Sequence, residues 1–276
     1  MIGDLFTRDP QSFIESNLDN ETERKTPLVF VHVAKTAGSS FREELAERFQ
    51  PAENVFVDFS KLRSPVSPEQ YSAVMESNLS DLDAHHIMKC RMVSGHFSYA
   101  QIAGKPNLSN GRLISFIRNP VSRLASFYDY HCSSAHPDNA FFKSQYPSFR
   151  HFIQQPENIN DVSRQLTPGN FRNGVEAAEW VKQHYYWIGF QENYVASCKL
   201  LFAMNGMRFS PRHTIRVSEN SHAHFDARDI QLAEELNALD LQMFNTLNQD
   251  FAPVWGEIYR LTDYDRVFRS YMGYAA

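Results

Sequence analysis

The chain has 276 residues and a mass of 31.9 kDa, with 42% hydrophobic, 13% aromatic and 21% charged residues. This composition excludes disordered and low-complexity proteins, and the length suits one large α/β domain or two small ones. The net charge of −5 has the wrong sign for general attraction to nucleic acid or to an anionic membrane. We therefore expect no nucleic-acid partner, and any anionic ligand must be bound by a local cluster of donors.

The cysteines and the N-terminus indicate a compartment. Cys90, Cys132 and Cys198 form no C-x-x-C pair, so neither a disulfide framework nor a cysteine zinc site is indicated. The N-terminus lacks the basic and apolar regions of a signal peptide, and no apolar run approaches the 18 residues of a membrane span. We expect a cytoplasmic protein without a membrane span.

Strand and helix patterns alternate along most of the chain. Residues 1–26 are polar and predict an appended N-terminal arm, followed by a single domain over 27–276. Strands are predicted at 28–33, 54–59, 91–94, 113–117 and 187–190. Helices are predicted after Gly38 and at 121–131, 175–186, 192–204, 227–248 and 253–270. This alternation is typical of an α/β fold with an open, mostly parallel sheet and helices on both faces.

Two connecting regions carry weaker patterns. Residues 61–88 form a polar connector with helical patches. The stretch 132–172 contains prolines at 137, 147, 156 and 168, and prolines interrupt both helices and sheet ladders. It is predicted to be a loop-like insertion or lid.

The first candidate site is the loop AKTAGSS (34–40), between the strand LVFVHV and the helix FREELAERF. Backbone N–H groups of a tight loop at a helix N-terminus bind anions, and the helix dipole favours them further. Gly38 lets the backbone approach closely, and Lys35 adds a mobile positive charge. Hydroxyl donors come from Thr36, Ser39 and Ser40. The alternative is an ordinary turn whose serines cap the helix.

Spacing defines this loop further. Ser40 and Glu43 have the S-x-x-E spacing of a capping box, which predicts that the helix starts just after Gly38. A Walker A loop requires G-x-x-x-x-G-K-[ST], with its lysine after the second glycine. Lys35 precedes Gly38, the single glycine of the loop, so this is not a Walker loop.

The second candidate site is the segment RNPVSRLASFY, which follows the predicted strand LISFI. Arg118 ends that strand, where ligands bind in open parallel sheets. Asn119 is a natural N-cap and is followed by a proline, which suits the first helical position. Ser122 and Ser126 are four residues apart and share one helix face. In the alternative interpretation, Arg118 pairs with an acidic residue and the serines are plain helix surface.

The same segment bears on metal use. P-loop kinases usually hold Mg²⁺ with the loop Ser/Thr and with an aspartate that ends a neighbouring strand. The strand LISFI runs instead into Arg118 and Asn119, which offer no carboxylate. An anion site lined with arginine and without a metal carboxylate suits a phosphate bound by direct pairing.

Together these segments resemble the PAPS-dependent sulfotransferases, specifically the carbohydrate branch that includes heparan sulfate 2-O-sulfotransferase and its bacterial relatives. The resemblance runs in order from about residue 27 to about residue 250. Its specific pieces are FVHVAKTAGSSF (30–41) and ISFIRNPVSRLASFY (114–128). The remaining pieces are VSGHFSY (93–99), NDVSRQLTP (160–168) and IGFQENYVASCKLL (188–201), of which the last two are weaker.

The resemblance implies a P-loop-like sulfotransferase fold, with PAPS (3′-phosphoadenosine 5′-phosphosulfate) as co-substrate. Lys35 would neutralise the bridging oxygen as the sulfuryl group leaves. The 5′ phosphate would be cradled by Thr36, Ala37, Gly38, Ser39 and Ser40. Arg118 and Ser126 would bind the 3′-phosphate, with Ser122 as a neighbour. Arginine suits this role because its guanidinium can form two parallel hydrogen bonds to one phosphate.

The resemblance also aligns His96, in SGHFSY, with the catalytic base of that branch. A neutral imidazole can take the acceptor's proton near neutral pH and contributes about 10²–10⁴-fold to such reactions. His32 lies inside the first strand and is predicted to belong to the core. Metal binding is not expected, because no carboxylate recurs at ligand spacing beside His85, His86, His131 and His136.

The expected reaction is in-line transfer of the sulfuryl group from PAPS to an acceptor hydroxyl, with Lys35 stabilising the departing PAP. Asn160 and Arg164 are predicted to line the acceptor side, and an ordinary polar lid explains them equally well. The negative net charge argues against a long polysulfated glycan and favours a short saccharide, a glycolipid or a small metabolite. Golgi members of the branch carry a membrane anchor and often disulfides, so we expect a soluble, bacterial-type enzyme.

Two other functions fit parts of the sequence. An ATP-dependent P-loop-type kinase would require Mg²⁺ and a strand-end aspartate, which the sequence lacks. A non-catalytic module that binds PAP or another nucleotide would keep Lys35 and Arg118 and would tolerate the loss of His96. The presence of His96 in its expected context favours an enzyme.

Overall fold

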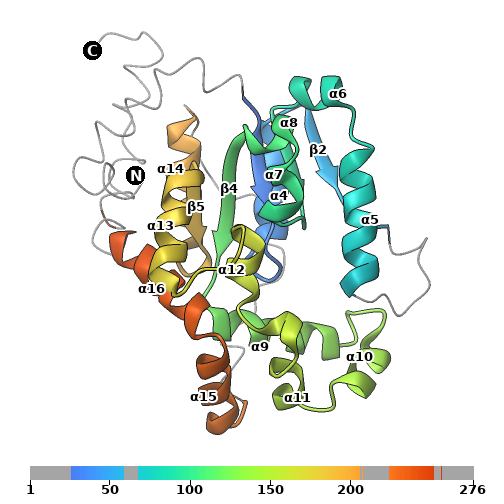
Figure 1. Cartoon of the computed structure of the whole chain (residues 1–276), viewed down its shortest axis with the longest axis vertical. Coiled ribbons are helices and arrows are strands. Elements are labelled where there is room, and N and C mark those ends of the chain that lie inside the picture. Colours follow the sequence, from blue (N-terminus) through green and yellow to red (C-terminus); the bar gives the residue numbers. More distant parts are fainter. Residues whose placement is uncertain (1–25, 59–67, 206, 208–223, 252–255, 257–276) are drawn as a thin grey trace.

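The computed structural model describes residues 26–58, 68–205, 207, 224–251 and 256. These residues form a sheet of parallel strands with helices packed against it (Figure 1). The predicted N-terminal arm and the predicted helix at 253–270 lie almost entirely outside the described residues. The division into an arm and a single domain therefore stays a prediction.

The described sheet has five strands in the order β2-β3-β1-β4-β5, and each neighbouring pair is parallel. The strands are β1 (Leu28–Val31), β2 (Ala52–Val55), β3 (Met92–Gly95), β4 (Arg112–Ile117) and β5 (Trp187–Phe190). All residues of the central strand β1 are buried, as expected of a continuous apolar run in a parallel sheet. The predicted open parallel sheet is confirmed. The strand predicted at 54–59 is misplaced, because β2 ends before Phe56, whose side chain is exposed.

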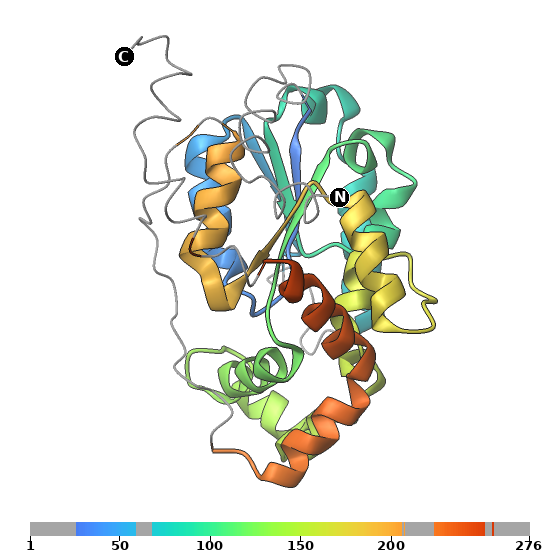
Figure 2. The ribbon, with the colours of Figure 1, turned by 90° about the vertical axis from the view of Figure 1, so that its left-hand side faces the viewer.

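Helices from distant parts of the chain cover the two faces of the sheet (Figure 2). One face carries α4 (Gly38–Arg48) and α14 (Tyr194–Met204), and the other carries α5 (Pro68–Ser80), α7 (Tyr99–Ala103) and α13 (Gly174–His184). α16 (Ala238–Phe251) packs along α13. α6 (Ala84–Lys89) and α8 (Pro106–Ser109) lie beyond the amino-terminal ends of the strands (Figure 1).

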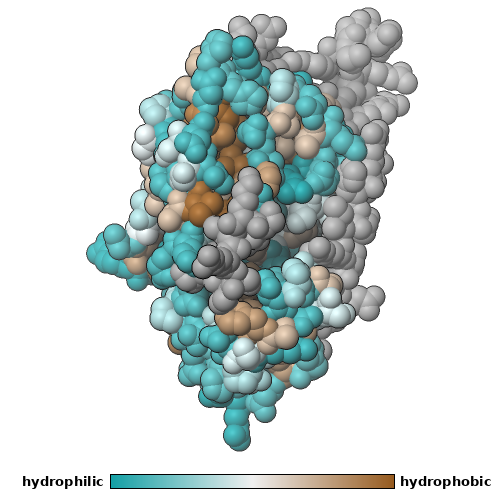
Figure 3. Space-filling model, turned by 90° about the vertical axis from the view of Figure 1, so that its right-hand side faces the viewer, coloured by the Kyte–Doolittle hydropathy of each residue, from teal (hydrophilic) through white to brown (hydrophobic). Residues whose placement is uncertain are grey.

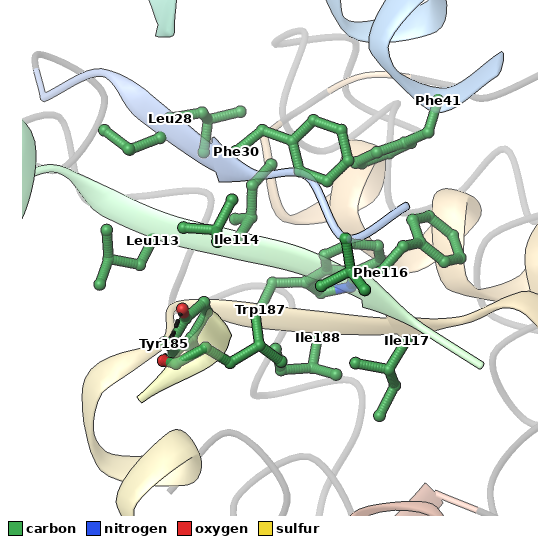
Figure 4. Packing of buried hydrophobic residues seen from close by; sticks show 14 of the residues in the cluster. Leu28, Phe30, Phe41, Leu113, Ile114, Phe116, Ile117, Tyr185, Trp187 and Ile188 are labelled. Carbon is green, nitrogen blue, oxygen red and sulfur yellow. Dashed lines mark hydrogen bonds between the residues drawn. The ribbon is translucent and has the colours of Figure 1, made fainter. Parts of the chain in front are cut away.

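A cluster of buried aromatic rings fixes α4 on the sheet (Figure 4). The centroid of the Phe41 ring lies 5.1 Å from that of Phe30 in β1 and 4.7 Å from that of Phe116 in β4. The same ring stacks on Trp187 of β5, with 5.4 Å between centroids. Such large buried rings dominate core energetics. The stripe that Phe41 begins is buried along the helix, as predicted, and it holds the loop before α4 at the end of β1.

A second helical cluster packs at the carboxyl ends of the strands, around α9 (Pro120–Cys132). It contains α10 (Asn139–Gln145), α11 (Phe149–Ile153) and α15 (Ala227–Leu236). Its buried core includes Leu124, Phe142, Phe149 and Phe152. The loop predicted at 132–172 is therefore wrong, since this stretch also holds a 3₁₀ helix (Pro156–Asn158) and α12 (Asp161–Leu166). Its prolines lie between or at the start of these short helices, where proline is tolerated.

The helix predicted at 227–248 is divided in two. α15 ends at Leu236 and α16 begins at Ala238, with Asn237 between them. The side chain of Asn237 donates to the backbone oxygen of Ala233, and its Oδ1 accepts from the backbone N–H of Asn160. Asn237 thus ends α15 and ties the break to α12, a contact that no sequence periodicity could reveal.

The surface agrees with the polar composition. The face that carries α5 is mostly hydrophilic, with a narrow hydrophobic strip (Figure 3), and the mean hydropathy of the chain is −0.45. Among the helices that the structure describes, none is long and apolar enough to cross a lipid bilayer.

Candidate active site

The carboxyl ends of the central strands bring the predicted site residues to one edge of the sheet. The anion loop follows β1, His96 follows β3 and Arg118 follows β4, and β1 lies between β3 and β4. The chain leaves β1 for β2 on one side and leaves β3 for β4 on the other. Ligands of open parallel sheets bind at such a switch point, outside the carboxyl ends of the strands.

The loop before α4 has an unusual backbone. Lys35 has a φ of 66° and Ala37 a φ of 67°, both in the left-handed region that non-glycine residues rarely adopt. Between them, Thr36 is fully buried and its Oγ1 donates to the backbone oxygen of Val33 at 2.8 Å. Such strain clusters at functional sites, where surrounding contacts hold it.

The helix itself starts earlier than predicted. α4 begins at Gly38, its N-cap is Ala37, and no side chain caps it. The predicted capping box of Ser40 and Glu43 is therefore wrong, because Ser40 already lies inside the helix. Ser39 is exposed at the same end, whereas Ser40 is buried. The first N–H groups of any helix lack intrahelical partners, so this end of α4 can bind an anion.

Gly38 is needed for a close approach between this helix and β1. A Cβ at Gly38 would lie 2.2 Å from two ring atoms of His32. The His32 side chain is only 3% exposed and stacks on Phe30, with 5.0 Å between ring centroids. The prediction that His32 belongs to the core is confirmed, and its ring forms the floor under the start of α4.

Lys35 reaches across to α9. Its Nζ lies 4.3 Å from the centroid of the Tyr130 ring, a cation–π distance. The same ammonium also acts on neighbouring groups, because it opposes the increase that burial causes in the pKa of Asp129. Burial lowers the pKa of His131 to about 4, and Lys35 contributes to that decrease. Sequence reasoning did not identify these α9 residues as neighbours of the loop.

Arg118 is a buried cation beside the anion loop. Its side chain is 8% exposed, and its Nη1 donates to the backbone oxygen of Lys35 at 3.4 Å. Its Nε is buried without a hydrogen-bond partner in the described part of the chain. Burial lowers the pKa of Arg118, and the carboxylate of Glu192 opposes that decrease. A buried guanidinium with an unused N–H is costly unless an acceptor satisfies it, and an anion is a strong acceptor for a guanidinium.

Glu192 is the acidic residue near Arg118 that the alternative interpretation requires, in which Arg118 pairs with an acidic side chain. Its Oε1 accepts a 2.8 Å hydrogen bond from the backbone N–H of Asn119, and its charge favours the charged form of Arg118. Asn119 caps α9 as predicted, since its Oδ1 accepts from the N–H groups of Val121 and Ser122. Ser126, one turn further along α9, is 4% exposed.

His96 is held in one tautomer. Its Nδ1 lies 2.8 Å from the backbone oxygen of His32, and since a carbonyl can only accept, Nδ1 carries the proton. Nε2 is therefore the basic nitrogen. The ring is accessible to solvent and stacks on the His32 ring at 4.0 Å between centroids. Burial by the surrounding protein lowers the pKa of His96, the carbonyl of His32 raises it, and Arg42 lowers it, so the neutral form prevails at pH 7.

Asn160 and Arg164, the predicted acceptor-side residues of the segment NDVSRQLTP, make local hydrogen bonds. Asn160 accepts from the backbone N–H of Asp240, and Arg164 donates to the backbone oxygens of Pro156 and Glu157. These contacts hold the chain locally, in agreement with the polar-lid alternative. Gln165, which sequence reasoning missed, donates to the backbone oxygens of His32 and Phe97 beside His96.

Two of the histidines considered for metal binding have protein partners. His86 pairs with Glu53 at 3.0 Å, and Nδ1 of His131 donates to the backbone oxygen of Phe127. Across the described ranges, no group of three or more His, Cys, Asp and Glu side chains is arranged to hold a metal ion.

Comparison with known proteins assigns the chain to a family. Residues 21–245 match the model of the sulfotransferase family. No curated protein matches the sequence. Among solved structures, the chain is similar to mouse sulfotransferase SULT7A1 complexed with PAP, with 17% identity, a TM-score of 0.38, and coverage of 95% of this chain and 94% of that chain. The family match covers most of the sequence and confirms the predicted enzyme class: the chain belongs to the sulfotransferase family.

Proposed function

We propose that the chain is a PAPS-dependent O-sulfotransferase in which His96 is the general base. Family membership supplies sulfuryl transfer. The observation that carries the proposal is the placement of an imidazole base, an anion loop and a buried arginine on three adjacent strand ends. PAPS carries two anionic groups, the 5′-phosphosulfate and the 3′-phosphate, and this arrangement suits both.

The nucleotide would be held by its two anionic ends. The loop 36–40 and the ammonium of Lys35 would bind the 5′-phosphosulfate, because the N-terminus of a helix directs backbone N–H groups and the positive end of its dipole toward an anion. Arg118 and Ser126 would bind the 3′-phosphate. The buried Nε of Arg118 supports this assignment, since it has no hydrogen-bond partner among the described residues. A 3′-phosphate oxygen would supply an acceptor for it.

The reaction balances with these groups. The acceptor oxygen attacks sulfur, the bond between sulfur and the 5′-phosphate oxygen breaks, and PAP leaves with the electron pair. Nε2 of His96 takes the acceptor's proton. Lys35 stabilises the charge that develops on the departing oxygen. We propose that no metal is required, because the transferred sulfuryl group is less anionic than a phosphoryl group and Lys35 supplies positive charge at the leaving oxygen, as Mg²⁺ does in kinases.

The acceptor is proposed to be a hydroxyl of a saccharide, a glycolipid or another small metabolite. A carbohydrate acceptor rests on the resemblance to the carbohydrate branch. The segment 132–172 is the proposed acceptor side, and Asn160 and Arg164 remain proposed contacts. Their present bonds to backbone groups would then serve to hold the segment in place.

Replacing His96 tests the proposal. With His96→Ala, we expect sulfuryl transfer from PAPS to fall by about 10²–10⁴-fold, while the Kd for PAP changes by only a few-fold. The matched control is His85→Ala, which removes an exposed histidine of α6, at the opposite, amino-terminal end of the sheet (Figure 1). Wild-type transfer by His96→Ala would overturn the proposed base, and so would a loss of PAP binding, which would make His96 structural.

The pH profile gives a second test. Since the surrounding protein lowers the pKa of His96, the base stays neutral to a more acid pH than a free imidazole. We expect kcat/KM to fall on the acid side with a midpoint below about 6.5, the ordinary histidine value. The residual activity of His96→Gln should lack this acid limb. An acid limb that persists in His96→Gln would assign it to another group.

A further inference from the structure

Gln165 of α12 connects the acceptor-side segment to the catalytic edge of the sheet. Its Nε2 donates to the backbone oxygen of His32 at 3.1 Å and to that of Phe97 at 3.3 Å. Both partners are carbonyls, so the network itself requires the amide nitrogen, and not its oxygen, on this side.

One of these carbonyls is also the partner of His96. The backbone oxygen of His32 accepts from Nδ1 of His96 at 2.8 Å and from Nε2 of Gln165 at 3.1 Å. Because a carbonyl has two lone pairs, both bonds form at once. The orientation of this carbonyl therefore sets the position of the imidazole ring.

The shared carbonyl lies where the pairing of β1 and β3 ends. The register of the two strands ends at Val31 and Gly95, followed by one further bond from the N–H of His32 to the oxygen of Gly95. Beyond this bond, Gln165 bridges the segments that follow β1 and β3, through the backbone oxygens of His32 and Phe97. The Gln165 side chain therefore connects the two segments where the strands no longer pair, next to His96.

The helix that carries Gln165 is itself firmly held. Asp240 of α16 accepts from the backbone N–H groups of Val162 and Ser163 at 2.8 and 2.9 Å. Arg123 of α9 pairs with Asp161 at 3.1 Å. Because these contacts hold α12 in place, the side chain of Gln165 has a fixed position from which it can orient the His32 carbonyl.

We propose that Gln165 is a positioning residue that fixes the tautomer and orientation of His96 through the backbone oxygen of His32. This inference rests on the proposed function, in which His96 is the base. In this proposal α12, which lies in the predicted lid 132–172, connects the acceptor side to the residue that removes the acceptor's proton.

The proposal predicts the direction in which His96 titrates when Gln165 is lost. The groups that act on His96 are the ring of His32, which directly follows β1, Arg42 of α4 and the amide of Gln165. Gln165→Ala frees the His32 carbonyl for Nδ1–H alone, removes the positive end of an amide dipole and admits water. All three changes favour the imidazolium, so the pKa of His96 should rise.

The experiment compares Gln165→Met, Gln165→Ala and a control, Gln183→Met, which replaces an exposed glutamine on α13. Methionine keeps the length and packing of glutamine and lacks its donors. We expect kcat to fall about tenfold in both Gln165 variants, since small misplacements of a base are costly. The Kd for PAP should stay within a few-fold, and Gln183→Met should behave as wild type.

Proton NMR of the imidazole Cε1–H of His96, assigned with His96→Ala, reports on the base itself, and Gln165→Met provides the comparison in which the packing is kept. Its titration midpoint should move to higher pH in Gln165→Ala. A wild-type kcat in Gln165→Met, or an unmoved midpoint in Gln165→Ala, would overturn the role of Gln165. The base assignment is tested separately, because it fails if His96→Ala transfers sulfate at the wild-type rate, whatever the Gln165 variants do.

Discussion

Gly38 shows how a single missing side chain shapes the site. The start of α4 approaches the His32 ring so closely that a Cβ would lie 2.2 Å from it, and that ring stacks on His96. The same glycine thus affects both the anion loop and the base. From the sequence, Gly38 is predicted to let the backbone approach a bound anion. In the structure, the group that Gly38 approaches is the ring of His32.

Gly38→Ala should therefore damage stability and nucleotide binding together. Forcing a methyl group against a buried ring costs about 1–3 kcal/mol, which a urea titration would measure, and the Kd for PAP should rise. The matched control is Gly104→Ala, where no heavy atom lies within 4 Å of the new Cβ. Equal stability of the two variants would contradict the close packing of α4 on His32.

Arg118 provides the residue-scale test of nucleotide identity. Arg118→Met removes the buried guanidinium while keeping much of its apolar stem, so the preference for PAP over adenosine 5′-phosphate should fall by about 2–3 kcal/mol, as for a lost charged hydrogen bond. Isothermal titration with both nucleotides measures that preference. Arg118→Lys should be intermediate, since an ammonium cannot form the bidentate pair. An unchanged preference in Arg118→Met would refute the 3′-phosphate assignment.

Sequence reasoning identified Lys35, His96 and Arg118, and the structure places all three at one edge of the sheet. It did not identify Gln165 or Tyr130. Both act through contacts between segments far apart in the chain, and neither has a spacing signal. The piece NDVSRQLTP did point to the right segment, but its pattern could not show which of its polar side chains faces the strands.

At the scale of elements, the longer helices could be predicted, and their ends less well. α9, α13 and α14 lie within two residues of the predicted limits at both ends, because their patterns are clear and Asn119 marks the start of α9. The predicted start of α4 is wrong because the helix begins after Ala37, whose backbone is left-handed. An alanine in the sequence gives no indication of that conformation. The stretch 132–172 was misread because its helices are too short for a visible periodicity.

α12 shows why such short helices need tertiary partners. A helix of six residues is not stable alone, and its N-cap residue makes no side-chain cap. Asp240, fully buried in α16, accepts from two of its first N–H groups instead. Burial raises the pKa of Asp240, and these bonds together with Arg123 oppose the increase. The cap therefore comes from a residue about 80 positions further along the chain.

Asp240→Ala should accordingly loosen α12. Two buried N–H groups lose their acceptor, so the free energy of unfolding should fall by about 1–3 kcal/mol, and kcat should fall because Gln165 is carried by this helix. Asp240→Asn keeps one amide oxygen and should lie between wild type and alanine. Asp138→Ala, at an exposed N-cap without a side-chain bond, is the control. If urea denaturation gives Asp240→Ala the stability of Asp138→Ala, the capping account fails.

At the scale of the molecule, the alternation of strands and helices predicted the open parallel sheet, but it could not give the strand order. That order decides which strand ends are neighbours. β1 between β3 and β4 brings the anion loop next to both His96 and Arg118, whereas another order of the same strands would separate them. The helical cluster around α9 adds a second hydrophobic core at this edge. The site therefore lies between the core of the sheet and the core of the helical cluster.

The site at the carboxyl ends of the strands is proposed to recognise a nucleotide with both 5′- and 3′-phosphates. A thermal-shift titration with PAP, run beside ADP and ATP–Mg²⁺, tests it most directly. Ligand at about 100 times its Kd stabilises a protein by about 2.7 kcal/mol, or about 5–10 °C for a chain of this size. We predict that shift with PAP and little with ATP–Mg²⁺. A shift with ATP–Mg²⁺ alone would contradict the account and indicate a kinase-type site.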